Sequence, residues 1–191
     1  DATKLTGNLP AISGASLTGI TAGGLVFISS VSASASAYME FTGIDSTYTN
    51  YFFTVDRIKP ATNTQEFELH IYSSGAYVTS NYYNTTYGYT SGGNLKTSHV
   101  SSGSAYNLTD TMNWGGNDIS GQLYYNDPSA AASYTPYNSY MVGNHSDGSA
   151  VSFLSSGWQG SGGTTITRVK FQMASGNITS GEIRMYGIVD A

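Results

Sequence analysis

The stretch that decides the fold is Glu66-Phe67-Glu68-Leu69-His70-Ile71-Tyr72, in which polar and apolar residues alternate strictly. Successive side chains of a β-strand point to opposite faces, so this pattern predicts a strand with one buried face and one solvated face. Thr165-Ile166-Thr167-Arg168-Val169-Lys170-Phe171-Gln172-Met173 repeats the design. We expect Phe67, Leu69, Ile71, Val169, Phe171 and Met173 to face inward, and Glu66, Glu68, His70, Arg168, Lys170 and Gln172 to face outward. Such alternation is typical of antiparallel sheets.

Further strands are predicted on both sides of these two segments, with turn residues between them. Turn signals include Ser73-Ser74-Gly75, Asp127-Pro128 and Asp147-Gly148. About ten short strands without a convincing helix predict an all-β, antiparallel β-sandwich of jelly-roll type over residues 25–191, preceded by an extended segment over residues 1–24. The additional strands are expected at residues 25–31, 37–41, 48–58, 119–126, 137–143, 151–155 and 182–189.

The composition excludes several functional classes. Charged residues make up 10% of the 191 residues and the net charge is −5, which argues against a nucleic-acid partner that needs a basic surface. There is no cysteine, so there is no disulfide framework. No apolar run reaches the roughly 18–20 residues of a membrane span, so we expect no membrane insertion.

The N-terminal segment carries a spaced aliphatic pattern. Leu5-Thr6-Gly7, Ile12-Ser13-Gly14 and Leu17-Thr18-Gly19 each place one aliphatic residue before a hydroxyl residue and a glycine. Isolated aliphatic residues cannot form a core within one chain, but several copies could pool them around an axis. A flexible Gly/Ser linker is the alternative. We therefore expect a homo-oligomer, most simply a trimer, with Leu5, Leu9, Ile12, Leu17 and Ile20 as its contacts.

Three stretches resemble proteins of bacteriophage virions. Residues 9–20, Leu-Pro-Ala-Ile-Ser-Gly-Ala-Ser-Leu-Thr-Gly-Ile, resemble the segment that precedes the distal domains of tail fibres and related appendages. Residues 41–51 resemble an early strand-turn-strand of β-sandwich virion proteins, and residues 181–188 resemble their closing strand. The resemblance implies a structural protein on the virion surface that contacts other virion proteins through its N-terminal segment and attaches to a host receptor. It carries no catalytic motif and implies no cofactor.

Tyrosines gather in Tyr77-Val78-Thr79-Ser80-Asn81-Tyr82-Tyr83-Asn84-Thr85-Thr86-Tyr87-Gly88-Tyr89-Thr90. Aromatic rings beside amides and hydroxyls suit sugar recognition, because a ring offers a flat apolar face and a polar tip. Two strands of a meander would explain the same stretch, since Tyr has high strand propensity. Trp114 and Trp158 flank Gly/Asn loops and could be ligand platforms, although a plug at an end of the sandwich is the preferred interpretation. The candidate contacts to a host-surface glycan are Tyr82, Tyr83, Tyr87, Tyr89, Trp114 and Trp158.

Catalytic and metal-binding patterns are weak. Glu66 and Glu68 lie about 7 Å apart on one strand face, which overlaps the spacing of inverting glycosidases, but a solvated strand face is the simpler interpretation. His70, His99 and His145 follow no metal-ligand spacing, and His145 with Asp147 lies in a predicted hairpin turn. We therefore expect a non-enzymatic protein without a metal. The alternatives to receptor attachment are a decoration or connector protein of a capsid or tail and, less simply, a polysaccharide-degrading enzyme.

Overall fold

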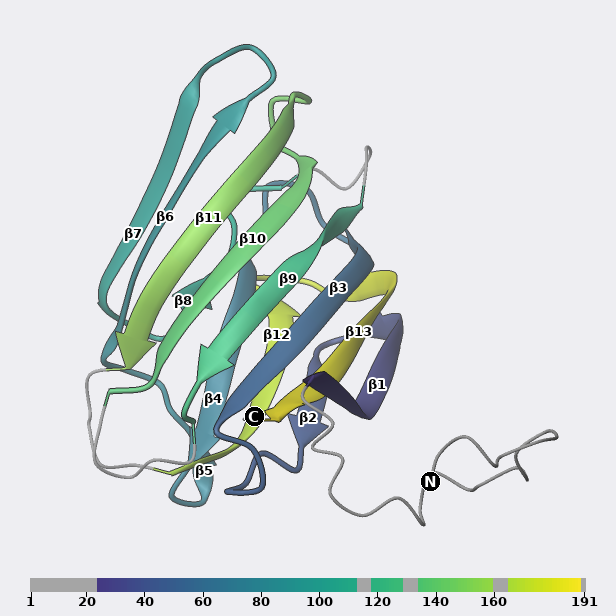
Figure 1. Cartoon of the computed structure of the whole chain (residues 1–191). Helices are drawn as coiled ribbons and strands as arrows, with labels where there is room; N and C mark the ends of the chain where they lie inside the picture. Colours follow the sequence, from purple (N-terminus) through teal and green to yellow (C-terminus); the bar gives the residue numbers. More distant parts are fainter. Residues whose placement is uncertain (1–23, 113–117, 129–133, 160–164, 190–191) are drawn as a thin grey trace, which may run out of the picture.

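The computed structural model describes residues 24–112, 118–128, 134–159 and 165–189, and in them the chain forms thirteen strands. The wider of two sheets has eight strands in the order β1-β13-β3-β9-β10-β11-β6-β7. Every pairing in it is antiparallel (Figure 1). Its strands are β1 (Gly24–Ser36), β3 (Asn50–Pro60), β6 (Tyr82–Thr90), β7 (Leu95–Gly103), β9 (Ile119–Asn126), β10 (Pro136–Asn144), β11 (Ala150–Gln159) and β13 (Ile178–Val189).

The second sheet lies behind the first in the view of Figure 1. Its strand order is β2-β12-β4-β5, with β8 paired to β4, and these pairings are antiparallel as well. The described chain is therefore all-β and antiparallel, as the sequence predicts. The strands of this sheet are β2 (Met39–Thr42), β4 (Phe67–Ser73), β5 (Ala76–Tyr77), β8 (Tyr106–Asn107) and β12 (Ile166–Met173).

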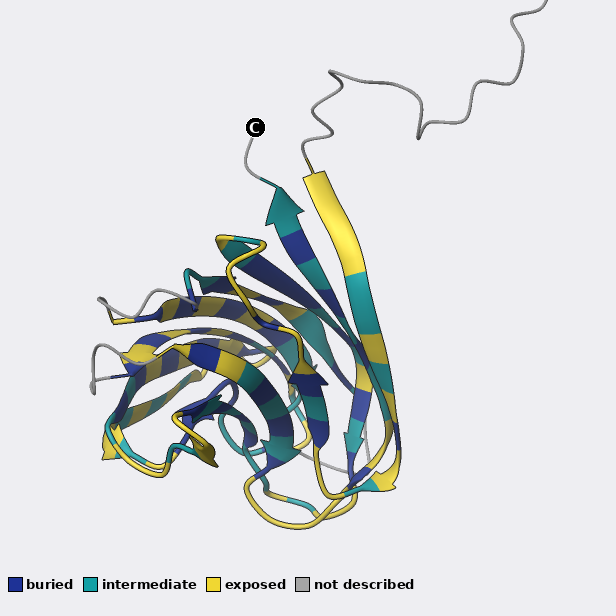
Figure 2. Cartoon of the chain, turned by 90° about the horizontal axis from the view of Figure 1, so that it is seen from below, coloured by how far each residue is buried: buried dark blue, intermediate teal, exposed yellow. Residues whose placement is uncertain are grey.

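One hydrophobic core lies between the two sheets. Phe171 of β12 is at its centre, with its ring centroid 5.4 Å from that of Phe53, 5.8 Å from Phe67 and 6.0 Å from Phe41. These four rings come from both sheets, so their contacts hold the sheets together. Along the strands, buried and exposed residues alternate, which produces the stripes in Figure 2. The predicted inward residues Phe67, Leu69, Ile71, Val169, Phe171 and Met173 are all buried.

Local turn chemistry agrees with the sequence at two hairpins. Between β4 and β5, Ser74 and Gly75 have φ angles of 53° and 89°, and between β10 and β11 Gly148 has a φ of 85°. Glycine accepts such left-handed conformations without a side-chain clash, which explains why glycine ends both turns.

Strand β7 is absent from the sequence prediction. Its residues, Leu95 to Gly103, are mostly polar, and it forms an outer edge of the wider sheet where no face is fully buried. Without a buried face a strand lacks an apolar alternation to detect. The predictions for Leu5, Leu9, Ile12, Leu17, Ile20 and Trp114 lie outside the described residues.

Candidate functional site

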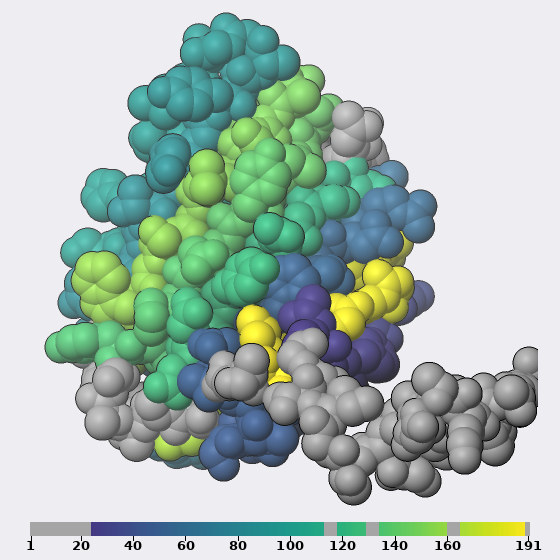
Figure 3. Space-filling view, viewed as in Figure 1, coloured from purple at the N-terminus to yellow at the C-terminus, as the bar shows by residue number. Residues whose placement is uncertain are grey.

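The outer face of the eight-stranded sheet carries a continuous band of aromatic and aliphatic side chains. Cross-strand register places Tyr87 of β6 beside Leu154 of β11, and Leu154 beside Tyr140 of β10. These three side chains are between 42% and 46% exposed. Their strands are neighbours in the sheet, so the band runs across the strands and not along one of them. Figure 3 looks onto this side of the molecule.

A second row of side chains lies beside this band. It begins at the β1 edge with Phe27, which pairs with Tyr186, and continues through Phe52 to Tyr124 on β9. The ring centroids of Phe27 and Tyr186 are 5.7 Å apart, and those of Phe52 and Tyr124 are 4.7 Å apart. Beyond Tyr124 the row becomes polar, with Asn138, Ser156, Thr85 and His99 on successive strands.

Trp158 and Tyr83 form an aromatic platform where β11 pairs with β6. Their rings are stacked, with centroids 5.9 Å apart and planes inclined by 14°. Trp158 is 49% exposed. The interpretation of Trp158 as a plug at an end of the fold is therefore wrong, because its ring lies on the outer face of the sheet.

Tyr82 does not belong to this surface. Its side chain is fully buried, and its hydroxyl accepts a hydrogen bond from the backbone N–H of Ile71 (2.9 Å) and donates to the carbonyl of Val78 (3.2 Å). The prediction that Tyr82 contacts a ligand is therefore wrong. Side chains alternate between the two faces of a strand, so Tyr82 lies on the inner face of β6, whereas Tyr83, Tyr87 and Tyr89 lie on the outer face.

Two neighbouring hollows indent the outer face. The first has a volume of about 280 Å³ and lies among Tyr87, Gln122, Tyr124, Tyr140 and Leu154. The second, of about 260 Å³, lies among Tyr83, Thr85, His99 and Trp158. Ser156 lines both, so the hollows adjoin each other. None of the residues that line either hollow is an Asp, Glu, Lys or Arg.

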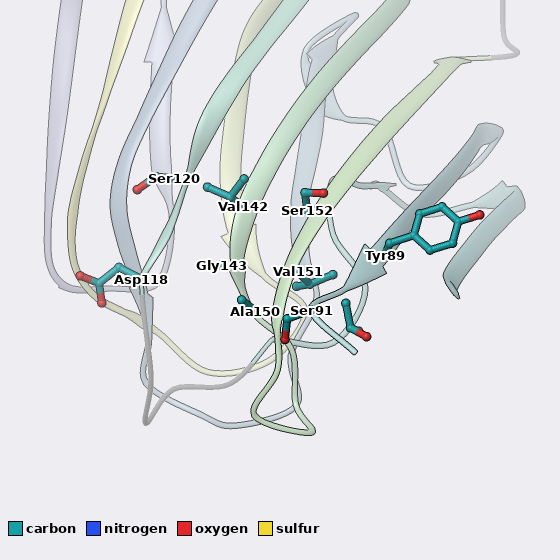
Figure 4. A pocket seen from close by; sticks show the side chains of 10 residues that line it. Tyr89, Ser91, Asp118, Ser120, Val142, Gly143, Ala150, Val151 and Ser152 are labelled. Atoms are coloured by element: carbon teal, nitrogen blue, oxygen red, sulfur yellow. The ribbon is translucent and has the colours of Figure 1, made fainter. Parts of the chain in front are cut away.

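A third and wider hollow lies at the end of the same sheet. Its volume is about 470 Å³, and Figure 4 shows Ser120, Val142 and Ser152 projecting from adjacent strands into it. Tyr89 lies at one end of this row and Asp118 lies near the other. This hollow differs from the two others because it has a carboxylate in its lining.

A buried polar network supports the aromatic face from the inside. The Asn107 carbonyl of β8 accepts hydrogen bonds from Asn84 Nδ2 (3.0 Å), Thr86 Oγ1 (2.6 Å) and Ser155 Oγ (2.8 Å). Asn84 Oδ1 accepts a bond from the Asn107 N–H at 3.2 Å, and the Tyr137 hydroxyl lies 2.7 Å from Ser155 Oγ. The network ties β6 and β11, which carry the exposed rings, to β8 of the other sheet.

A set of charged residues lies on the outer face of the five-stranded sheet. Arg168 lies over the ring of Tyr72 (4.7 Å to the centroid), and Lys170 lies over the ring of Tyr77 (4.4 Å). The Tyr77 hydroxyl donates a hydrogen bond to Glu40. Burial, together with the carboxylate of Glu40, raises the pKa of Tyr77 well above its ordinary value. These contacts pair the charges within the sheet, and the outward orientation predicted for Arg168 and Lys170 is confirmed.

The predicted carboxylate pair does not form a free catalytic set. Glu68 Oε2 lies 2.9 Å from His70 Nε2 and accepts a 3.5 Å hydrogen bond from Gln172. Partial burial, reinforced by the charges of Glu68 and Asp110, raises the pKa of Glu66. Among the described residues there is no group of three or more His, Asp or Glu side chains that could hold a metal ion.

His145 lies in the hairpin turn between β10 and β11, as the sequence indicates. Its Nδ1 is 3.1 Å from Asp147 Oδ2, and Lys96 Nζ is 3.0 Å from the same oxygen. Hydrogen bonds from Ser149 hold the pKa of Asp147 below its ordinary value, with Lys96 and His145 contributing in the same direction. These contacts join His145 to Asp147 within the turn and connect the turn to Lys96 of β7.

Comparison with known protein families, with curated proteins and with solved structures finds no match. No helix in the described ranges is long and apolar enough to cross a membrane.

Proposed function

We propose that this chain is a structural protein of a bacteriophage virion, the distal domain of a tail fibre or appendage that attaches to a host-surface glycan. The observation that carries the proposal is the aromatic outer face of β9, β10, β11 and β6, whose two hollows have no Asp, Glu, Lys or Arg in their linings. Exposed rings beside amides and hydroxyls provide apolar stacking and directional hydrogen bonds in one place, which a sugar surface requires. Adhesion by several weak sites on one particle gains strength from effective concentration.

The strand order supports a jelly-roll topology for this domain. The chain alternates between the sheets through β1, β2, β3 and β4, and it returns through β12 in the five-stranded sheet and β13 in the eight-stranded sheet. β1 pairs with β13, and β2 pairs with β12, so the first and last strands are nested as in a jelly roll. In this scheme the hairpins β6–β7 and β10–β11 are additions that widen one sheet.

The added hairpins carry most of the aromatic face. Tyr83, Tyr87 and Tyr89 come from β6, Tyr140 comes from β10, and Trp158 comes from β11. The inner side of these strands belongs to the core, in which Tyr82, Met141 and Phe153 are fully buried. The exposed rings on the outer side support a recognition role for this part of the sheet.

The start of β1 supports self-association of the chain. Leu25, Val26 and Phe27 are exposed, and they directly follow the segment in which the aliphatic residues predicted to join the copies occur. Exposed apolar residues at a sheet edge favour contact with another protein surface. We take the occupant to be a second copy of this chain, within a homotrimer.

Sedimentation of the full chain tests this assembly. We expect a trimer, and we expect Leu25→Ser with Phe27→Ser, or Leu9→Ser with Ile12→Ser, to shift the population toward monomer. A monomeric full chain at micromolar concentration would refute the assembly, and a trimer that survives both double substitutions would place the interface elsewhere.

Glycan binding by the full chain tests the recognition role. We expect binding on an array of bacterial surface glycans, and we expect Tyr87→Ser with Trp158→Ala to abolish it. Tyr38→Ala is the matched control, because Tyr38 is also an exposed aromatic residue but contacts Lys170 of the other sheet. An array without any binding would favour the second candidate, a decoration or connector protein, which the exposed apolar start of β1 also supports.

A further inference from the structure

The two adjoining hollows on the outer face have the same chemistry. In the first, the rings of Tyr87, Tyr124 and Tyr140 stand beside the amides of Gln122 and Asn138. In the second, the Trp158 and Tyr83 platform stands beside the hydroxyl of Thr85 and the ring of His99. Each hollow therefore offers a ring face for stacking together with groups that donate or accept hydrogen bonds.

The position of the hollows defines a path across the sheet. The first hollow spans β9, β10, β11 and β6, and the second spans β11, β6 and β7. These five strands are consecutive in the sheet. Four steps of about 4.8 Å between neighbouring strands give a path of roughly 19 Å, which is long enough for several consecutive sugar units.

The lining also defines the charge of the ligand. A carboxylate or sulfate that leaves water needs an opposite charge or several donors in return, and otherwise its desolvation opposes binding. Neither hollow contains Lys or Arg in its lining, and the whole chain has a net charge of −5. The acidic residues of the chain would also repel an anionic polymer at low salt.

We infer that the ligand of this face is an uncharged oligosaccharide or polysaccharide chain that runs across the strands and occupies both hollows at once. The inference rests on the proposed glycan recognition and specifies its substrate class. Consecutive sugar rings stack on the first group of tyrosines and on the Trp158 and Tyr83 platform, while amide and hydroxyl groups bind the sugar hydroxyls. Ser156 lies at the junction of the two subsites.

Fluorescence of Trp158 provides a direct probe of occupancy. The chain has two tryptophans, so the full-length variant Trp114→Phe retains Trp158 as its only tryptophan. Neutral glucan, galactan and mannan oligosaccharides of two and six units are titrated against it, with polyuronates of the same lengths as the acidic arm. We expect at least one neutral hexasaccharide to change the emission, with affinity at least tenfold higher than its disaccharide, and we expect no response to the polyuronates.

Calorimetry with substitutions in the full chain separates the two subsites. Tyr140→Ala in the first hollow and Trp158→Ala in the second should each weaken hexasaccharide binding about tenfold, whereas Tyr38→Ala should leave it unchanged. Preference for the polyuronates, or hexasaccharide binding that only one of the two substitutions weakens, would overturn the inference while the glycan proposal stands. If neutral and acidic saccharides all fail to bind here and on the array, both are overturned.

Discussion

Substitution of Asn84 tests the buried polar network that supports the aromatic face. The Asn84 side chain makes three hydrogen bonds of 3.0–3.2 Å, two to the backbone of Asn107 and one to Thr86. Each contributes about 1 kcal/mol, and Asn84→Ala also leaves the buried N–H of Asn107 without this partner. We therefore expect a loss of about 3 kcal/mol in the free energy of unfolding.

Tyr137→Phe is the matched comparison at the edge of the same network. It removes one hydroxyl, which lies 2.7 Å from Ser155 Oγ, and keeps the buried ring. We expect a loss of about 1 kcal/mol. For a chain of this size the two substitutions should lower the melting temperature by about 6–12 °C and 2–4 °C respectively.

Urea unfolding at fixed protein concentration measures both losses, since self-association would otherwise change the apparent stability. Asn84→Leu distinguishes lost hydrogen bonds from lost volume, because it fills the site without restoring any bond. If Asn84→Leu were as stable as the unsubstituted chain, or if Tyr137→Phe cost more than Asn84→Ala, the hydrogen-bond network would not be the source of the stability.

Three further substitutions, and Leu95→Ala as a control, test the core and the titrating groups. Phe171→Ala should cost about 3–5 kcal/mol in urea unfolding because it leaves a cavity among rings of both sheets, whereas the exposed Leu95→Ala should change stability by less than about 0.5 kcal/mol. Glu66→Gln should raise the melting temperature at pH 7 but not at pH 3: the pKa of Glu66 is raised in the fold, so ionisation of this carboxyl destabilises the protein as pH rises. Asp147→Asn should lower the melting temperature at pH 7, because the lowered pKa of Asp147 reflects contacts made only by the carboxylate. The difference should begin to shrink below about pH 4 and should keep shrinking as pH falls through the lowered folded-state pKa. For each of the two carboxylates, a change in melting temperature that is the same at pH 7 and pH 3 would contradict the prediction.

The sequence predicts the strands that have one apolar face. β4 and β12 alternate strictly between apolar and polar residues, and the buried set that includes Leu69 and Val169 follows directly. In β6 the order is reversed, since Asn84 and Thr86 are buried while Tyr87 and Tyr89 are exposed. Hydrophobicity alone would place Tyr87 and Tyr89 inward and Asn84 and Thr86 outward. Asn84 and Thr86 can be buried because β8 and β11, which are distant in the sequence, supply their hydrogen-bond partners.

The candidate site depends in the same way on pairing between distant segments. Tyr140 and Leu154 are ordinary strand residues in the sequence, and they gain significance because register places Leu154 beside Tyr87 and Tyr140 beside Leu154. Trp158 is exposed because it lies on the outward face of β11, where it pairs with Tyr83 of β6 near the end of the strand. A period-two pattern defines two faces for each strand, but strand order decides which faces join into one surface.

Strands β10, β11 and β6, which are consecutive in the sheet, have a consequence for how this protein can diversify. Their outward residues occupy alternate positions, at 83, 85, 87 and 89 in β6, at 138, 140 and 142 in β10, and at 152, 154, 156 and 158 in β11. Changes there leave the inward residues of the same hairpins intact, so the chemistry of the outer face can change without loss of the fold. Among natural variants of this chain, we expect sequence differences to recur at every second residue of these three strands, with the intervening positions held constant.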